Sequence, residues 1–159
     1  MEQAVVDQGP DGTVSSGSER APWHLWVVGV LSLLWNAMGA FDYSMTHLRG
    51  DEYLRQMGMS DDVVAWFAAV PAWATAGWAF GVWGAIAGSL LLLARSRHAV
   101  TAFGLSLAGV VVMTIYTLGH AAPDSVNSPG AQAFNWAIKA VALLLLIYAL
   151  AMRRREVLR

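Results

Sequence analysis

The sequence predicts an all-α integral membrane protein: a four-transmembrane-helix bundle with a short helix lying at the outer interface. Three observations lead to this prediction. Hydrophobic residues make up 57% of the 159 residues and charged residues only 13%, which is about half the charged share of a typical soluble domain. Four segments have the roughly 20 apolar residues needed to cross a bilayer. These segments are continuous runs rich in Leu and Ala, whereas barrel strands alternate apolar and polar residues.

The four predicted spans are joined by short links, so consecutive spans are expected to be antiparallel neighbours. They cover approximately residues 23–43, 71–94, 99–121 and 131–152. The preceding segment, residues 1–21, is acidic and rich in Ser and Gly. It buries too little apolar area to fold and lacks the features of a signal peptide. We therefore predict a disordered cytoplasmic tail followed by a transmembrane domain over residues 22–159.

The positions of the basic residues predict the direction of the spans. Seven basic residues fall on one side of four alternating helices: Arg20, Arg95, Arg97, Arg153, Arg154, Arg155 and Arg159. The links on the other side contain only Arg49 and Arg55. Because cytoplasmic loops are enriched in Lys and Arg, both termini are predicted to be cytoplasmic in a bacterial inner membrane. Residues 44–60 and 122–130 are then expected outside.

The link after the first span is predicted to contain a helix. Ser60 is a suitable N-cap, and Asp61 and Asp62 suit the first helical turn. The uncharged stretch from residue 63 to residue 94 is too long for one crossing at about 1.5 Å per residue, and Pro71 can kink or break it. We expect a short interfacial helix and a turn into the membrane near Pro71. The alternative is one long tilted helix.

A stripe of small residues runs along one face of the second span. Its members recur at a spacing of three and four: Ala74, Gly77, Gly81, Gly84 and Gly88. This spacing keeps them on one helix face, where small side chains allow a second backbone to approach closely. The first interpretation is helix packing within one chain. The alternative is a homodimer seam through Gly77, Gly81, Gly84 and Gly88.

Polar residues occur in three of the predicted spans at a similar depth in the outer half. Such groups are costly within a membrane and usually face the bundle interior or a wet cavity. The predicted lining of a solute-binding site is Asn36, Asp42, His120, Asn135 and Lys139. An Asp42–Lys139 ion pair is expected because pairing lowers the cost of both charges. The alternatives are a pair that only fixes helix register, and a Lys139 side chain that extends to the outer interface.

The tryptophans mark the expected membrane interfaces. Trp23 and Trp26 fall near the inner interface, and Trp66, Trp73 and Trp136 near the outer one, as in the aromatic belts of membrane proteins. Trp35, Trp78 and Trp83 lie deeper. Packing is the first interpretation of these three residues, and lining a pocket is the alternative.

Other chemistry has less support in the sequence. Met45, His47, Met57 and Met59 lie near the first outer link and are soft ligands of the kind that hold Cu(I), although Met is also ordinary packing material. The chain has no Cys. It shows no nucleophile–base arrangement, phosphate loop or zinc-protease motif, so we expect neither an enzyme nor a cofactor. The net charge of −1 gives no basis for binding nucleic acid.

Three motifs carry a resemblance to a known group. They are Trp35-Asn36-x-x-Gly39-x-x-Asp42-Tyr43, Val70-Pro71-Ala72-Trp73, and the Gly-rich span ending in Gly88-Ser89 and four leucines. Together they resemble small four-helix bacterial inner-membrane proteins that are often automatically labelled "sugar transporter". The resemblance covers roughly residues 23–155 and implies transport or binding of a small solute, with no substrate residues to carry over.

Four helices are few for a complete solute path, so a transporter of this size is expected to act as a homodimer in the lipid bilayer. The alternative function is a non-enzymatic structural or accessory membrane subunit. Metal handling on the periplasmic side is a further, less favoured alternative.

Overall fold

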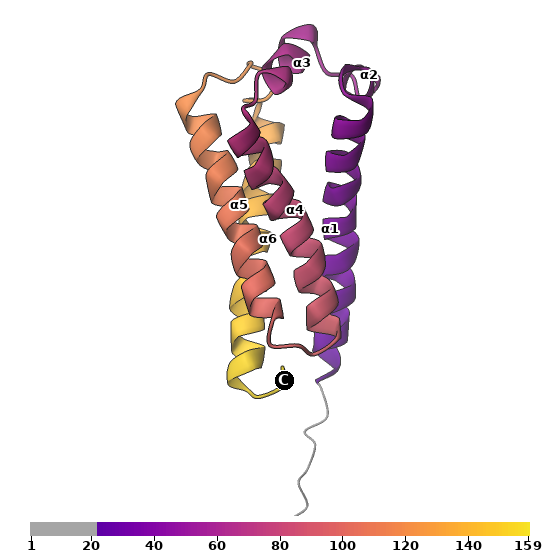
Figure 1. Ribbon diagram of the computed structural model, residues 1–159, viewed down its shortest axis with the longest axis vertical. Helices are drawn as coiled ribbons and strands as arrows, with labels where there is room; N and C mark the ends of the chain where they lie inside the picture. The colour runs from indigo at the N-terminus through magenta and orange to yellow at the C-terminus, as the bar shows by residue number, and fades with distance from the viewer. Residues whose placement is uncertain (1–21) are drawn as a thin grey trace, which may run out of the picture.

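The computed structural model describes residues 22–159, and this part of the chain is helical, without strands (Figure 1). Its helices, in chain order, are α1 (Trp23–Arg49), α2 (Asp51–Gln56), α3 (Asp61–Ala68), α4 (Ala72–Leu93), α5 (Ala99–Gly119) and α6 (Pro129–Arg154). Four of them, α1, α4, α5 and α6, are long and apolar enough to cross a membrane. The four predicted spans are thereby confirmed in length and composition. The predicted cytoplasmic tail, residues 1–21, lies outside the described residues.

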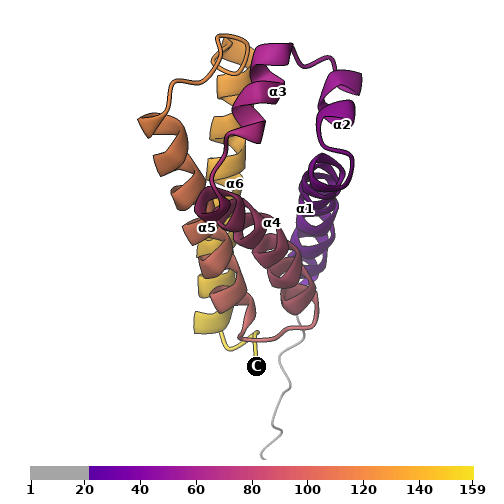
Figure 2. The same cartoon turned by 45° about the horizontal axis from the view of Figure 1, so that its top comes forward.

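The long helices alternate in direction, so the bundle has two different ends (Figure 1). One end, which we call the α2–α3 end, holds α2, α3 and the link between α5 and α6 (Figure 1). When the bundle is turned, α2 and α3 lie across this end, from α1 toward α5 and α6 (Figure 2). The opposite end, which we call the arginine end, holds Arg95, Arg97, Arg153, Arg154, Arg155 and Arg159.

The predicted stripe of small residues is the contact face between α4 and α5. Its members are all buried: Ala74, Gly77, Gly81, Gly84 and Gly88. The backbones approach so closely that the Ser106 hydroxyl of α5 donates a hydrogen bond to the carbonyl of Gly81, at 2.6 Å. A Cβ on Gly84 would lie 3.0 Å from the backbone nitrogen of Ser106. Packing within the chain, the first interpretation, is confirmed. A homodimer seam through Gly77, Gly81, Gly84 and Gly88 would require α5 to move away.

Pro71 separates two helices and does not merely kink one. The preceding helix, α3, ends at Ala68, and Pro71 has extended backbone angles (φ −72°, ψ 155°) as the N-cap of α4. Proline suits this position because its missing N–H is not needed at the start of a helix. The predicted helix after Ser60 is present as α3, and the alternative of one long tilted helix is not what the structure shows.

The short helix α2 was not predicted from the sequence. Gly50 ends α1 at φ 53° and ψ −130°, a combination that is essentially restricted to glycine, and the chain turns there to begin α2. The apolar side of α2 is held by a small cluster in which Tyr53 and Leu54 pack with Val64 of α3. This cluster fixes α2 and α3 to each other above the ends of α1 and α4.

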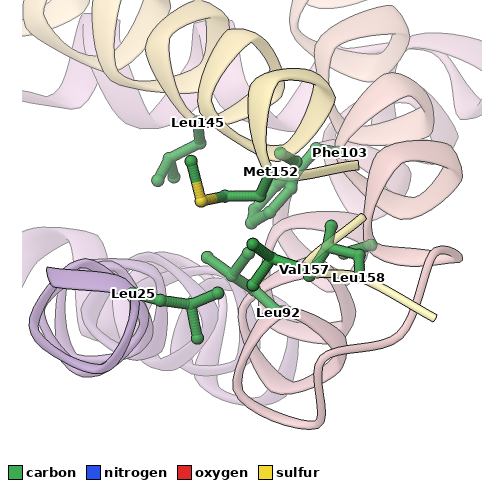
Figure 3. Packing of buried hydrophobic residues seen from close by; sticks show 9 residues of the cluster. Leu25, Leu92, Phe103, Leu145, Met152, Val157 and Leu158 are labelled. Atoms are coloured by element: carbon green, nitrogen blue, oxygen red, sulfur yellow. The ribbon is translucent and has the colours of Figure 1, made fainter. Parts of the chain in front are cut away.

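At the arginine end, all four long helices share a hydrophobic core. Its larger members are Leu25 of α1, Leu92 of α4, Phe103 of α5, Leu145 and Met152 of α6, and Val157 and Leu158 beyond α6 (Figure 3). The His24 ring of α1 and the Tyr148 hydroxyl of α6 form a hydrogen bond beside this core, at 2.6 Å. This bond joins α1 to α6, and the two helices meet again where the rings of Trp35 and Phe134 lie 6.0 Å apart.

The residues that follow α6 fold back under the bundle. Just beyond α6, Glu156 has φ 57°, and the amide of Val157 donates to the carbonyl of Met152, the hydrogen bond of a Schellman motif. Farther on, the Arg159 amide donates to the Arg95 carbonyl at 2.7 Å, and the Arg95 Nε donates to the Val157 carbonyl at 3.2 Å. These bonds hold the end of the chain in a position where Val157 and Leu158 are buried in the core.

Candidate functional site

A pocket of about 220 Å³ lies at the α2–α3 end, between the end of α1, the two short helices and the start of α4. Its walls include Thr46, His47, Asp51, Phe67, Thr75 and Trp78. The pocket exists because Gly50 turns the chain at the end of α1 and Pro71 turns it again before α4. The segment between these two turns lies across the bundle and does not close tightly on it. The pocket is therefore a consequence of the two helix breaks.

The short helices are held over the pocket by a polar contact as well as by apolar packing. The Tyr53 hydroxyl of α2 donates to a carboxylate oxygen of Asp42 on α1, at 3.0 Å. Burial of the ring, with the hydrogen bond to Asp42 and the negative charge of that carboxylate, raises the pKa of Tyr53 above its usual value. The hydroxyl stays protonated and able to donate at neutral pH.

One wall of the pocket is aromatic. The rings of Tyr43 and His47 on α1 are stacked at a centroid distance of 4.1 Å. Trp78 of α4 meets both rings edge-on, at 5.0 Å from Tyr43 and 5.5 Å from His47. Phe67 of α3 lies 6.1 Å from Trp78. Aromatic pairs at such distances stabilise a contact beyond simple burial, so this wall is a packed assembly of rings from three helices.

The His47 ring contacts the backbone of its own helix. Its Nδ1 lies 2.9 Å from the backbone carbonyl of Tyr43, and because a carbonyl only accepts, this contact is a hydrogen bond in the tautomer with its hydrogen on Nδ1. In the neutral ring, Nε2 is then the acceptor. The same arrangement recurs in α5, where His120 is stacked on Tyr116 at 4.3 Å and bonds its carbonyl at 2.9 Å. Spacing of four residues between Tyr and His is the sequence signal for both.

The α2–α3 end is acidic. Its acidic residues are Asp42, Asp51, Glu52, Asp61, Asp62 and Asp124, and its arginines are Arg49 and Arg55. Arg49 pairs with Glu52 at 2.7 Å, and Arg55 pairs with Asp61 at 3.2 Å. Within the described chain the other four carboxylates have no basic partner. This end therefore has an excess of negative charge, and Asp51 is the one of these acidic residues that lines the pocket.

The five residues predicted to line a common site are not brought together. Asn36 donates to Ser89 of α4 at 3.0 Å and so joins α1 to α4 inside the bundle. Asn135 is exposed and bonds only the Ala131 carbonyl of its own helix. None of the five lines the pocket, although Asp42 lies one helical turn before the pocket residue Thr46.

The expected direct ion pair between Asp42 and Lys139 is wrong. Asp42 accepts from Tyr53, and the Lys139 amine lies over the ring of Trp136, 4.8 Å from its centroid. The physical reasons are the order of the helices and the depth of the two residues. Helix α6 packs on α5, whereas Asp42 on α1 turns toward α2. From the level at which Trp35 of α1 contacts Phe134 of α6, Asp42 lies toward the α2–α3 end and Lys139 lies toward the arginine end. A cation–π contact takes the place of the pair.

The weak metal-ligand candidates are also dispersed. Met45 packs against the cluster of Tyr53 and Leu54, Met57 and Met59 are exposed, and His47 belongs to the aromatic wall. Over residues 22–159, no group of three or more His, Asp or Glu side chains is placed to hold a metal ion.

Sequence reasoning missed most of the pocket. The sequence singles out Trp78, for packing or pocket lining, and His47, as a metal-ligand candidate. The pocket residues Asp51, Phe67, Thr46 and Thr75 carry no signal of their own. They come together only because two turns fold the first outer link back over α1 and α4.

Comparison with known proteins adds no family to this description. No family model matches the chain, and no curated protein or solved structure is significantly similar to it. The function is therefore inferred from the geometry alone.

Proposed function

We propose that this is an integral membrane protein that binds a small solute in the pocket at the α2–α3 end. The observation that carries the proposal is the pocket itself: a hollow of about 220 Å³ with an aromatic wall, two threonines and a carboxylate. Small-molecule sites commonly combine an apolar or aromatic surface with a few placed polar groups. The protein would thus be a solute-binding or transport component and not an enzyme.

The α2–α3 end is proposed to face the outside of a bacterial inner membrane. Support comes from the alternation of the four long helices and from the six arginines gathered at the opposite end. Since basic residues are retained on the cytoplasmic side, the pocket would receive its solute from outside. Both termini would then be cytoplasmic.

Binding has better support than passage through a single bundle. The backbone of α5 packs directly against the glycine face of α4 and closes the space between these two helices. At the other end, the core from Leu25 to Leu158 fills the space between the four long helices (Figure 3). A solute in the pocket does not pass through these packed layers. If the protein transports its solute, a second copy or a large movement of α1 or α6 would have to provide the path.

The test is ligand-dependent stabilisation of the purified protein. A ligand that binds only the folded state raises the free energy of unfolding, by about 2.7 kcal/mol at 100 times its Kd. A panel of sugars, amines and metal ions should include a solute that raises the melting temperature. Trp78→Leu should remove this effect. Trp83→Leu should keep it, because Trp83 lies on the same helix but is 52% exposed and outside the pocket.

The accessory-subunit alternative makes the opposite prediction. A protein whose polar residues only hold helices together gains no stability from any member of the panel. An unchanged melting temperature with every solute would therefore contradict the proposed function.

A further inference from the structure

We propose that the solute is an organic cation, carrying an amine or quaternary ammonium group, and this inference rests on the proposed function of the pocket. The pocket combines three features that favour a positive charge: aromatic rings, a carboxylate without a basic partner, and uncommitted hydrogen-bond acceptors. No one of them would carry the inference alone. Because all three features occur in one pocket, together they favour an organic cation as the solute.

The first feature is the aromatic wall. Trp78, Phe67 and His47 line the pocket, and the rings of Tyr43 and His47 contact Trp78 at 5.0 and 5.5 Å. A cation within about 6 Å of the face of an aromatic ring is attracted by the ring quadrupole, most strongly by Trp. The same chain already shows this contact elsewhere, where the Lys139 amine lies over Trp136.

The second feature is the balance of charge. Asp51 lines the pocket, and within residues 22–159 it forms no ion pair with a Lys or Arg side chain. The two arginines nearest to it in sequence are already paired, Arg49 with Glu52 and Arg55 with Asp61. A surface with an excess of one sign raises the local concentration of counter-ions and steers them inward. An anionic solute would be repelled by the same field.

The third feature is the set of acceptors. Thr46, Thr75 and His47 line the pocket, and their side chains can accept hydrogen bonds, His47 through Nε2 when Nδ1 carries the hydrogen. These atoms suit the N–H groups of a primary or secondary amine. The volume of about 220 Å³ suits a small molecule.

The experiment compares a cation with its neutral isostere. Choline and 3,3-dimethylbutanol have nearly the same shape, and only choline carries the charge. The purified full-length protein in detergent is titrated with each compound and with glucose, and the melting temperature and tryptophan fluorescence are recorded. Choline is expected to stabilise the protein and to bind at least about tenfold more tightly than the isostere, a difference of about 1.4 kcal/mol.

Two matched variants locate the effect. Asp51→Asn removes the pocket carboxylate, and we expect it to weaken choline binding about tenfold. Asp62→Asn removes an exposed carboxylate outside the pocket and should change the affinity less than about twofold. Trp78→Phe should keep part of the affinity that Trp78→Leu loses, because a smaller ring still presents a π face. Both Trp78 variants are checked for folding by their melting temperatures without ligand.

The outcomes separate the two proposals. Equal stabilisation by choline and by its isostere, or stabilisation by glucose alone, would overturn the cation inference and leave the binding function standing. Equal loss of affinity in Asp51→Asn and Asp62→Asn would also overturn it, because the charge would then act from the surface in general. Failure of every compound, in a panel widened to other sugars, amines and metal ions, would contradict both proposals.

Discussion

At the scale of single residues, the hydrogen bond from Tyr53 to Asp42 determines how α2 is held on α1. The pKa of Tyr53 is raised in the folded protein by burial and by Asp42, above the value of about 10 expected in an unfolded chain. The folded state therefore retains its proton at a pH where the unfolded state releases it. The resulting stability is fully present below about pH 10 and is lost as the pH rises through the raised pKa.

Tyr53→Phe tests this contact. We expect the variant to lose about 0.5–1.5 kcal/mol of stability at neutral pH, the usual net value of a hydrogen bond. The difference in melting temperature between wild type and variant should shrink above pH 10. Melting curves from pH 7 to pH 11.5 measure it, and a difference that stays constant up to pH 11.5 would show that the hydrogen bond does not hold α2.

Glu156 is the second residue with a specific prediction. It lies two residues beyond the end of α6 at φ 57°, a conformation that costs a non-glycine residue about 1–2 kcal/mol. Glu156→Gly should raise the melting temperature, by the equivalent of about 0.5–1 kcal/mol after the entropy cost of glycine. Glu156→Gln keeps the side chain and removes the charge, so it should not stabilise. An equal gain in the two variants would assign the effect to charge.

At the scale of elements, the contact between α4 and α5 decides which glycines are replaceable. A Cβ on Gly84 would lie 3.0 Å from the Ser106 nitrogen and 3.1 Å from the Ala102 oxygen, both in the backbone of α5. At Gly81 the nearest atom would be 3.6 Å away, an ordinary contact. Gly84→Ala should therefore destabilise the protein by about 1–3 kcal/mol, whereas Gly81→Ala should be tolerated.

Gly104 provides the control for helix propensity. It lies in α5, and a Cβ there would meet nothing within 4 Å, so Gly104→Ala should be neutral or stabilising by up to about 1 kcal/mol. The melting temperatures of Gly84→Ala, Gly81→Ala and Gly104→Ala measure the order of their stabilities. If Gly84→Ala were as stable as Gly104→Ala, α4 and α5 would not be in backbone contact.

At the scale of the whole molecule, the sequence predicted the positions of the long helices better than it predicted which helices pack against each other. The four spans follow from apolar length, and the packing face of α4 follows from its glycines, because both are local properties of one segment. Helix α1 continues to Arg49, beyond the predicted end near Tyr43, since its hydrogen bonds persist after its apolar residues end. Helix α2 was missed because six residues are too few to show a period.

The site was harder to predict because it depends on the order of the helices around the bundle. The positions of Asp42 and Lys139 in their spans suggest a common depth, but the contact between Trp35 of α1 and Phe134 of α6 places the two residues at different levels. Their separation also depends on helix order, and nothing local in α1 or α6 specifies that α6 packs on α5. The pocket likewise depends on the turns at Gly50 and Pro71, which fold one link over two helices.

The central claim is that the pocket opens to the outside and holds a solute, and cysteine labelling in intact cells tests it most directly. The chain has no Cys, so each single-cysteine variant reports one position to a membrane-impermeant maleimide. Thr46→Cys lies in the pocket, Asp62→Cys lies outside it at the same end, and Arg155→Cys lies at the arginine end.

We predict that the first two are labelled from outside and that Arg155→Cys is labelled only after the membrane is permeabilised. Choline, or the solute that raises the melting temperature, should slow labelling at position 46 and leave position 62 unchanged. Labelling of Arg155→Cys in intact cells, or equal labelling of position 46 with and without the solute, would contradict the claim.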